Sequence, residues 1–211
     1  MGLVKFDDKK YVTVLGSDAT FRLVVDKNTE GATLREYESS DGVKGEKWEL
    51  VFNQLFGKIL NIEFHDGEYG KNLLITVSDG TEEYTLSLNT GTPFGEDMLK
   101  KLPSVDLTKE VSLTPYAFED DKGKTKKGMT VKQDGVAIKN FFYDGTKNIN
   151  GYPEPKPKKG DKPYTTDDWK IYFTEARIFL VEYVEEKIIP TFSRVVSDDT
   201  TSEIVAEEIA F

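Results

Sequence analysis

Two clusters of lysine are the first feature of this chain with an obvious chemistry. The first comprises Lys122, Lys124, Lys126 and Lys127, and the second comprises Lys156, Lys158, Lys159 and Lys162. Ammonium groups concentrated in a loop attract phosphate. Aromatic rings beside them would add platforms on which bases stack, each stacked base contributing ~1–3 kcal/mol. Phe118 shortly precedes the first cluster, so that segment is a candidate nucleic-acid site; the alternative is a solvated hairpin tip.

Catalytic chemistry finds little support in the residue types. The chain has no cysteine and one histidine, His65, which argues against a disulfide framework, a thiolate or histidine metal site and a serine–histidine triad. Phosphate-binding glycine loops and a nucleophile elbow are absent from the sequence. The acidic pairs at 120–121 and 167–168 are explained by solvated charge and helix capping, and His65 by a surface position. We therefore predict a non-enzymatic protein without cofactor or metal.

The net charge of −10 argues, taken alone, against a nucleic-acid partner. Its distribution weakens that objection, because residues 197–211 hold five acidic residues and no basic one. A local positive surface can coexist with a negative total charge. The charge is thus compatible with a basic site on the body of the protein and an acidic C-terminal tail.

Composition points to a globular protein of ordinary size. Of the 211 residues, 37% are hydrophobic and 31% are charged, and no apolar run approaches the ~20 residues of a membrane helix. The first eight residues lack the charged and apolar blocks of a signal peptide. We expect a cytosolic protein.

The clearest structural pattern is a hairpin over residues 71–89. Leu73, Ile75 and Val77 alternate with Asn72, Leu74 and Thr76 before Asp79-Gly80, and the alternation resumes at Tyr84. An Asp-Gly pair tolerates the positive φ angles of tight hairpin turns. The sequence therefore predicts two antiparallel strands here.

The elements around this hairpin follow the order of a known small barrel. A long strand is expected from Trp48 to Phe64, with a bend at Gly57, and a short helix from Pro93 to Leu102. Strands near residues 111–116 and 129–131 follow. Three strands, a helix and two strands are the order of the OB-fold, so we predict a mainly β protein with a five-stranded Greek-key barrel at 45–143.

The flanking segments are expected to be appendages. Residues 1–44 predict a β extension with strands at 11–15 and 21–26, and residues 144–164 predict a linker rich in proline and lysine. Residues 165–190 predict a helix capped by Thr165 and stopped by Pro190, followed by the acidic tail at 191–211. The apolar stripe that includes Trp169 and Phe173 would pack on the barrel or contact a second protomer.

Together, the order of elements, the segment Gly57-Lys-Ile-Leu-Asn-Ile-Glu-Phe64, the lysine loop and the end Glu207-Glu-Ile-Ala-Phe211 resemble the single-stranded DNA-binding proteins of tailed phages. More distantly, they resemble the bacterial ones, whose acidic tails end in Ile-Pro-Phe. Ala210 stands where bacterial tails have proline. The resemblance implies that the tail recruits replication or repair proteins, through Asp198, Asp199, Glu203, Glu207, Glu208, Ile209 and Phe211.

An OB-fold would place the DNA track across its second and third strands, between two loops. Tyr69 and Lys71 would then lie at one edge of the track, and Phe118 with the first lysine cluster at the other. Further candidate rings for base stacking are Trp48, Tyr84, Tyr116, Phe141 and Tyr143, for each of which core packing is the alternative.

The resulting hypothesis is sequence-tolerant binding of single-stranded DNA in phage replication, recombination or repair. The alternative is a virion, assembly or other protein-interaction barrel that oligomerises through the C-terminal helix. A convergence of Lys71 with the lysine loop beside exposed rings would favour DNA binding, and scattering would favour the alternative. Whether the protein is a monomer or a homo-oligomer is left open by the sequence.

Overall fold

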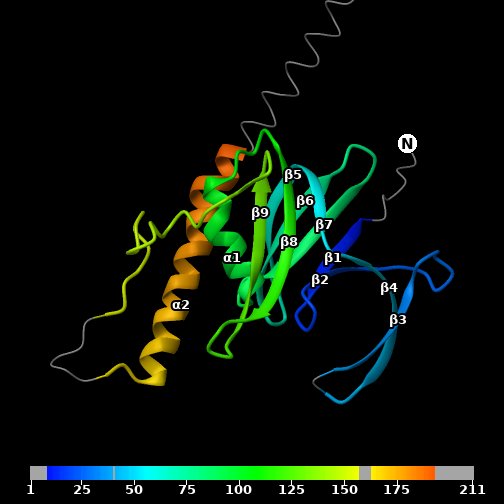
Figure 1. Ribbon diagram of the computed structural model, residues 1–211, viewed down its shortest axis with the longest axis horizontal. Helices are drawn as coiled ribbons and strands as arrows, with labels where there is room; N and C mark the ends of the chain where they lie inside the picture. The colour runs from blue at the N-terminus through cyan, green and yellow to red at the C-terminus, as the bar shows by residue number, and fades with distance from the viewer. Residues whose placement is uncertain (1–8, 40, 157–162, 193–211) are drawn as a thin grey trace, which may run out of the picture.

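The computed structural model describes residues 9–39, 41–156 and 163–192, and within them the protein is mainly β (Figure 1). One mixed sheet of ten strands runs in the order β10-β9-β8-β5-β6-β7-β1-β2-β4-β3. Its strands are β1 (Lys10–Leu15), β2 (Thr20–Val24), β3 (Thr33–Glu38), β4 (Lys44–Phe52), β5 (Leu55–Gly67), β6 (Gly70–Ser78), β7 (Glu83–Asn89), β8 (Glu110–Glu119), β9 (Thr125–Gln133) and β10 (Val136–Ala137). The helices are α1 (Pro93–Lys101), a 3-10 turn (Leu102–Ser104) and the long α2 (Thr166–Tyr183), which continues into a π-helical turn (Val184–Ile188).

The central hairpin is confirmed. β6 and β7 pair antiparallel, and the side chains of Leu73, Ile75 and Val77 are fully buried, as their alternation predicts. The connection spans four residues rather than two. Asp79 Oδ1 accepts hydrogen bonds from the backbone N–H groups of Thr81 and Glu82, both at 2.9 Å, so the aspartate orders a wider turn than the Asp-Gly pair suggests.

The expected long first strand is two strands. Trp48 belongs to β4, which pairs with β2 and β3, and the chain changes neighbours at residues 53–54 before β5 begins. Residues 55–58 of β5 pair with β8, whereas residues 58–67 pair with β6. Gly57 permits this change of partner, because a Cβ there would lie 2.1 Å from the carbonyl oxygen of Ser78.

In place of the five-stranded barrel expected at 45–143, the described residues form a larger open sheet of ten strands. β5, β6, β7, α1, β8 and β9 occur in the expected order, but β7 pairs on its other side with β1, in parallel. The backbone groups at the edge of β7 are thus occupied by the N-terminal strands. Strands β1, β2, β4 and β3 extend the sheet from that edge, so the N-terminal segment is continuous with the rest of the sheet.

Helix α1 lies against one end of the apolar interior and covers part of the edge of β9. Phe94, Met98 and Leu99 are buried in the same core as the inward residues of β6, β8 and β9. Asp97 accepts a hydrogen bond from the N–H of Met129 at 2.8 Å, and Lys101 Nζ donates one to the carbonyl oxygen of Met129 at 2.6 Å. These side chains satisfy backbone groups that an exposed edge strand would present for pairing.

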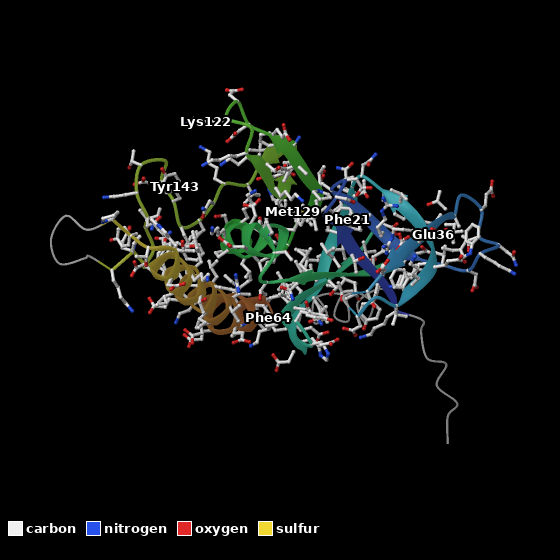
Figure 2. The ribbon with its side chains drawn as sticks, turned by 90° about the horizontal axis from the view of Figure 1, so that it is seen from below. Phe21, Glu36, Phe64, Lys122, Met129 and Tyr143 are labelled. Carbon is white, nitrogen blue, oxygen red and sulfur yellow. The ribbon has the colours of Figure 1, made fainter. Side chains whose placement is uncertain are left out.

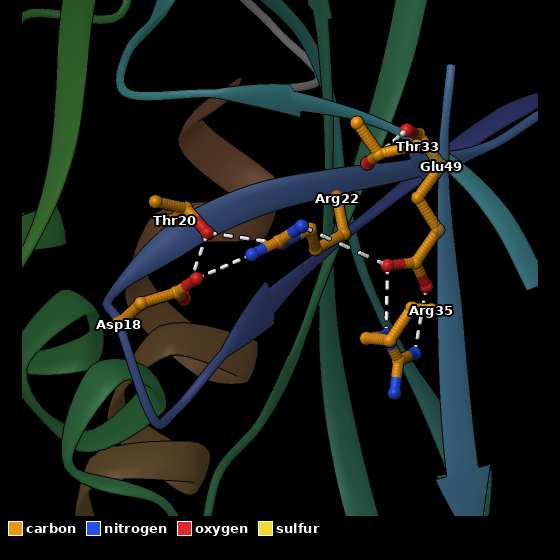
Figure 3. Close-up of polar contacts among 6 residues, drawn as sticks. All are labelled: Asp18, Thr20, Arg22, Thr33, Arg35 and Glu49. Atoms are coloured by element: carbon orange, nitrogen blue, oxygen red, sulfur yellow. Dashed lines mark hydrogen bonds and ion pairs between the residues drawn. The ribbon is translucent and has the colours of Figure 1, made fainter.

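The N-terminal strands are joined by a buried carboxylate (Figure 3). Glu49 of β4 is 1% exposed and accepts two hydrogen bonds from the guanidinium of Arg35, at 2.8 and 2.6 Å. Arg22 lies 4.0 Å from the same carboxylate and also pairs with Asp18. The hydrogen bonds from Arg35 hold the pKa of Glu49 below its ordinary value, so the bridge between β2, β3 and β4 stays ionised at neutral pH.

Helix α2 begins as expected and ends later. Thr165 and Asp168 form a capping box, but the helical run passes Pro190 to residue 192. A proline removes one helical donor and crowds the preceding turn. Here the wider π-helical turn at 184–188 immediately precedes Pro190 and accommodates it. Within the described part of the chain, no helix has the length and apolar character needed to cross a membrane.

The second half of α2 packs against the body, and part of the expected linker packs with it. Leu180 and Val184 are buried in the core. The ring of Phe142 lies 5.5 Å from that of Phe179 and 5.7 Å from that of Tyr152, centroid to centroid. Tyr152, inside the segment predicted as linker, is therefore part of an aromatic cluster that attaches α2.

Candidate nucleic-acid interface

The β8–β9 hairpin has one buried and one outward side. Val111, Leu113, Met129 and Val131 point inward and are fully buried. The cross-strand partners on the other side are Ser112 with Lys132, Thr114 with Thr130, Tyr116 with Gly128, and Phe118 with Lys126. Phe56 of β5 is the cross-strand partner of Ser112 and therefore lies on the same outward side. We call the surface formed by Phe56, Ser112, Thr114, Tyr116, Phe118, Lys126, Thr130 and Lys132 the β8–β9 face.

This face combines exposed rings with ammonium groups. Phe118 is 56% exposed, Phe56 is 50% exposed, and the rings of Tyr116 and Phe118 lie 5.8 Å apart. From Ser112 to Phe118 the strand covers ~20 Å at ~3.3 Å per residue. That is several times the 3.4 Å rise per nucleotide of a duplex strand. An extended strand of nucleic acid could therefore contact a ring and a lysine at both ends of the face.

The ring of Tyr116 lies across the hairpin over Gly128, where there is no side chain to displace it. A Cβ at residue 128 would lie 2.4 Å from both Tyr116 Oη and Asp97 Oδ2. The hydroxyl of Tyr116 donates a long hydrogen bond of 3.4 Å to Asp97, and burial together with the charge of Asp97 raises the pKa of Tyr116. The ring is therefore fixed over Gly128 and stays neutral at physiological pH.

The turn between β8 and β9 presents the lysines. Asp120 Oδ1 accepts hydrogen bonds from the backbone N–H groups of Lys122 at 3.0 Å and Lys124 at 2.9 Å, so both lysines are exposed on an ordered turn. The hydrogen bond from Lys124 is the main cause that lowers the pKa of Asp120. The second carboxylate oxygen of Asp120, Oδ2, lies 3.7 Å from Lys126 Nζ. Asp120 thus organises the cations but also neutralises part of their charge.

The other predicted edge of the DNA track, at Tyr69 and Lys71, lies on a different part of the surface. Lys71 Nζ donates to Glu185 at 2.6 Å and lies 5.4 Å from the centre of the Phe64 ring. Figure 2 shows Phe64 and Lys122 on opposite sides of the molecule. Tyr69 is exposed in the turn between β5 and β6, beside α2. The two edges expected for one track are therefore not brought together, and this scattering favours the protein-interaction alternative for that track. The β8–β9 face is a separate candidate surface for nucleic acid.

The other predicted residues divide between the interior and separate surfaces. Lys127 points to the inner side of the hairpin, where its Nζ donates to the carbonyl oxygen of Gly16 at 2.5 Å. Tyr84 is half-buried and donates to Glu82 at 2.6 Å. Trp48 is half-buried in β4, and Phe141 packs on Phe142 with ring centres 5.1 Å apart. Tyr143 is exposed after β10 and donates to the carbonyl oxygen of Gly145.

The remaining predictions fall mostly outside the described residues. The tail residues Asp198, Asp199, Glu203, Glu207, Glu208, Ile209 and Phe211 lie there, as do Lys158, Lys159 and Lys162 of the second lysine cluster. Lys156 of that cluster is described and pairs with Glu175 of α2. Of the two lysine clusters, the first lies wholly within the described residues.

Sequence reasoning missed Phe56 and Lys132. Lys132 could have been found, because it alternates with the buried Val131 and Gln133 and must face outward with Lys126. Phe56 reaches the face only through the pairing of β5 with β8, between residues more than fifty positions apart. A local pattern carries no signal for that pairing.

Comparison of the chain with protein-family models, with curated proteins and with solved structures finds no match. Over residues 9–39, 41–156 and 163–192, no three histidine, cysteine, aspartate or glutamate side chains are grouped as metal ligands would be. Function is therefore inferred from the geometry of the described surfaces.

Proposed function

We propose that this protein is a non-enzymatic, sequence-tolerant binder of single-stranded DNA that uses the β8–β9 face. One observation carries the proposal: strand alternation aligns Phe118, Tyr116 and Phe56 on the same side as Lys126 and Lys132. Rings and cations together match the two parts of a single strand, its bases and its phosphates. Lys122 and Lys124 extend the cationic area at the adjoining turn.

We also propose that β5, β6, β7, β8 and β9 with α1 form an OB-like unit. The strands β1 to β4 precede this unit in the chain and extend its sheet. The chain order, the pairing of β5 with both β6 and β8, and the antiparallel β8–β9 hairpin support this proposal. In an OB-fold the loop between the last two strands borders the nucleic-acid site. The lysine turn at residues 120–124 corresponds to that loop.

Single strands suit this surface better than duplex. Stacking requires the flat side of a base, which a duplex hides between neighbouring base pairs. A duplex binder relies on more phosphate contacts, whereas this chain has a net charge of −10 and only a local group of exposed lysines on the proposed site. Because every base has a flat side, we expect little dependence on sequence.

The test is a titration of fluorescent oligothymidine against the full chain at several salt concentrations. Four phosphate contacts, from Lys122, Lys124, Lys126 and Lys132, predict a slope of log K against log salt of roughly −3. Double-stranded DNA of the same length should bind more weakly. Absence of binding at low salt would overturn the proposal.

The tail adds a separate part to the proposal. Residues 197–211 are strongly acidic and could compete with DNA for the lysines while offering Phe211 to a replication or repair protein. Deletion of 197–211 should then raise DNA affinity and abolish partner capture. An unchanged affinity would remove the competition part and leave the β8–β9 face intact.

A second candidate function follows from the first half of α2, which projects beyond the sheet (Figure 1). Trp169 is 38% exposed and Phe173 is 49% exposed, and their rings stack with centres 5.9 Å apart. With Tyr164 and Tyr172 they form what we call the α2 face. Contiguous exposed rings are typical of protein contacts, and this observation favours self-association through α2.

Sedimentation velocity over a range of protein concentrations tests that candidate. Self-association through α2 predicts oligomers that dissociate on dilution and that Phe173→Ala weakens, whereas Phe118→Ala leaves them unchanged. A protein that stays monomeric at all concentrations would contradict it.

A further inference from the structure

An apolar cleft opens where the N-terminal strands meet the start of β5. It has a volume of about 280 Å³ and is lined by Val12, Phe21, Phe52, Gln54, Leu55, Phe56, Asp79 and Tyr84. Val12 and Phe21 are buried and form part of the apolar lining. Phe52 is 40% exposed and is the cross-strand partner of Phe21, so its ring lies on the same side of β4 as the cleft. The cleft thus has flat apolar walls from β4, β5 and β7.

The cleft is continuous with the β8–β9 face. Phe56 belongs to both surfaces, and Gln54, which lines the cleft, donates a hydrogen bond to Ser112 of that face. Gln54 and Phe56 also line the neighbouring depression with Ser112 and Lys132, where Glu110 and the ion pair between Lys109 and Asp134 also form part of the lining. A strand lying along β8 would therefore reach the cleft at the Phe56 end without leaving the protein surface.

We propose that this cleft receives one unstacked base of the single strand bound along the β8–β9 face. The inference rests on the proposed DNA binding and adds a specific subsite to it. Ligand sites of drug-sized molecules span ~300–1,000 Å³, so about 280 Å³ suits a single ring system rather than a run of stacked bases. It also gives the N-terminal strands a function, because Val12, Phe21 and Phe52 come from them.

Charge at the cleft favours a base over a phosphate. Asp79 is the acidic residue of the lining, and a hydrogen bond from the hydroxyl of Thr81, followed by those from the backbone N–H groups of Glu82 and Thr81, lowers its pKa to about 2. An ionised carboxylate repels phosphate but accepts hydrogen bonds from the N–H groups on the edge of a base. The lysines lie outside the cleft, on the adjoining face, where the phosphates would run.

Photocrosslinking locates the base directly. The full chain is bound to oligothymidine carrying one 5-iodouracil at successive positions, irradiated, digested and analysed by mass spectrometry. We expect crosslinks to Phe52 or Tyr84 in the cleft as well as to Phe118 or Tyr116 on the β8–β9 face. Crosslinks confined to β8 and β9 would overturn the cleft and leave DNA binding standing. Absence of both crosslinks and a mobility shift would overturn DNA binding itself.

Variants of Phe52 provide an independent measurement. Removing one stacking ring in Phe52→Ala should weaken oligothymidine binding about five-fold or more, given the usual contribution of a stacked base. Phe52→Trp should retain affinity and report binding by quenched tryptophan emission. Phe173→Ala, a similarly exposed ring on α2, is the matched control. Equal affinity of Phe52→Ala and the unmodified chain would contradict the inference.

Discussion

The β8–β9 face and the α2 face both expose aromatic rings, but they differ in how the rings and charges are arranged. On the β8–β9 face the rings follow strand register, and Phe118 stands directly across from Lys126. On the α2 face Trp169 and Phe173 cover each other one helical turn apart. Lys170 of that helix pairs with Asp167, at 3.3 Å. The ring pairs themselves are about equally close, with centres 5.8 Å apart on the β8–β9 face and 5.9 Å apart on the α2 face, so the difference lies in the charged residues beside them.

The difference indicates which partner each surface suits. Bases need a ring that is flat, exposed and close to a cation, and Phe118 meets those conditions. The α2 face gathers four aromatic rings beside a lysine that is paired with Asp167, and such a broad apolar area is better matched by another protein surface. Exposed aromatic residues alone therefore do not identify a nucleic-acid site, and their charged neighbours help to do so.

The largest expected effect separates the two surfaces. The triple substitution Phe118→Ala, Lys126→Ala and Lys132→Ala should weaken oligothymidine binding about 100-fold, because one stacked base and two phosphate contacts are lost. The salt slope should fall by about 1.4. The matched triple Phe173→Ala, Lys170→Ala and Lys187→Ala removes the same residue types from α2 and its extension. Equal losses of oligothymidine affinity in both triple variants would show that the two faces do not differ in DNA binding.

A smaller effect is expected from Gly128→Ala. The added methyl group would collide with Tyr116 Oη and Asp97 Oδ2, so the ring must move. Overpacking of this kind costs about 1–3 kcal/mol, measurable by chemical denaturation, and we expect a several-fold loss of DNA affinity. Gly16→Ala is the control, since a Cβ there meets only Phe94, at 3.9 Å. Unchanged stability of Gly128→Ala would show that Tyr116 is not fixed as described.

Asp120→Asn should act in the opposite direction. The amide oxygen retains an acceptor for the N–H groups of Lys122 and Lys124, while the negative charge beside Lys126 disappears. We expect DNA affinity at low salt to rise about two- to three-fold, a value typical of an exposed charge pair. Asp167→Asn, which removes the partner of Lys170 on α2, should have no effect on DNA binding. A loss of affinity in Asp120→Asn would contradict the neutralising role of Asp120.

The smallest effect concerns pH. The pKa of Asp120 is lowered in the folded protein, so its contribution to stability is present above the unfolded pKa near 3.8 and is lost as pH falls through the lower folded value. Carboxyl-carbon NMR should show a midpoint for Asp120 below 3.8. A midpoint at or above that value would mean that the lysine turn is not ordered by this residue.

Local patterns predicted much of the fold. Alternation at Leu73, Ile75 and Val77 identified buried strand positions, and Thr92-Pro93 and Thr165 with Asp168 marked the starts of both helices. The predicted end of α2 at Pro190 was wrong, because a π-helical turn accommodates this proline. The division between Trp48 and Phe56 was also missed, since a change of strand partner leaves no periodic signal.

The candidate site was predicted only in part for the same reason. Phe118 and the lysines beside it were found because they are neighbours in sequence. Lys71 was assigned to the same track by analogy with a five-stranded barrel, but Glu185 engages it beside α2. Phe56 and Phe52 were missed, because each reaches its surface through pairing with a distant strand.

The sequence by itself determined the central hairpin and its inward side, the helix caps and the lysine turn, because these follow from the spacing of residues close together in the chain. Tertiary structure decided that β1 occupies the edge of β7, that Phe56 joins Ser112 and Lys132, and that Lys71 is paired with Glu185. Strand edges offer the same backbone donors and acceptors to many partners. The choice among them is made by packing of the whole core, which no short stretch of sequence contains.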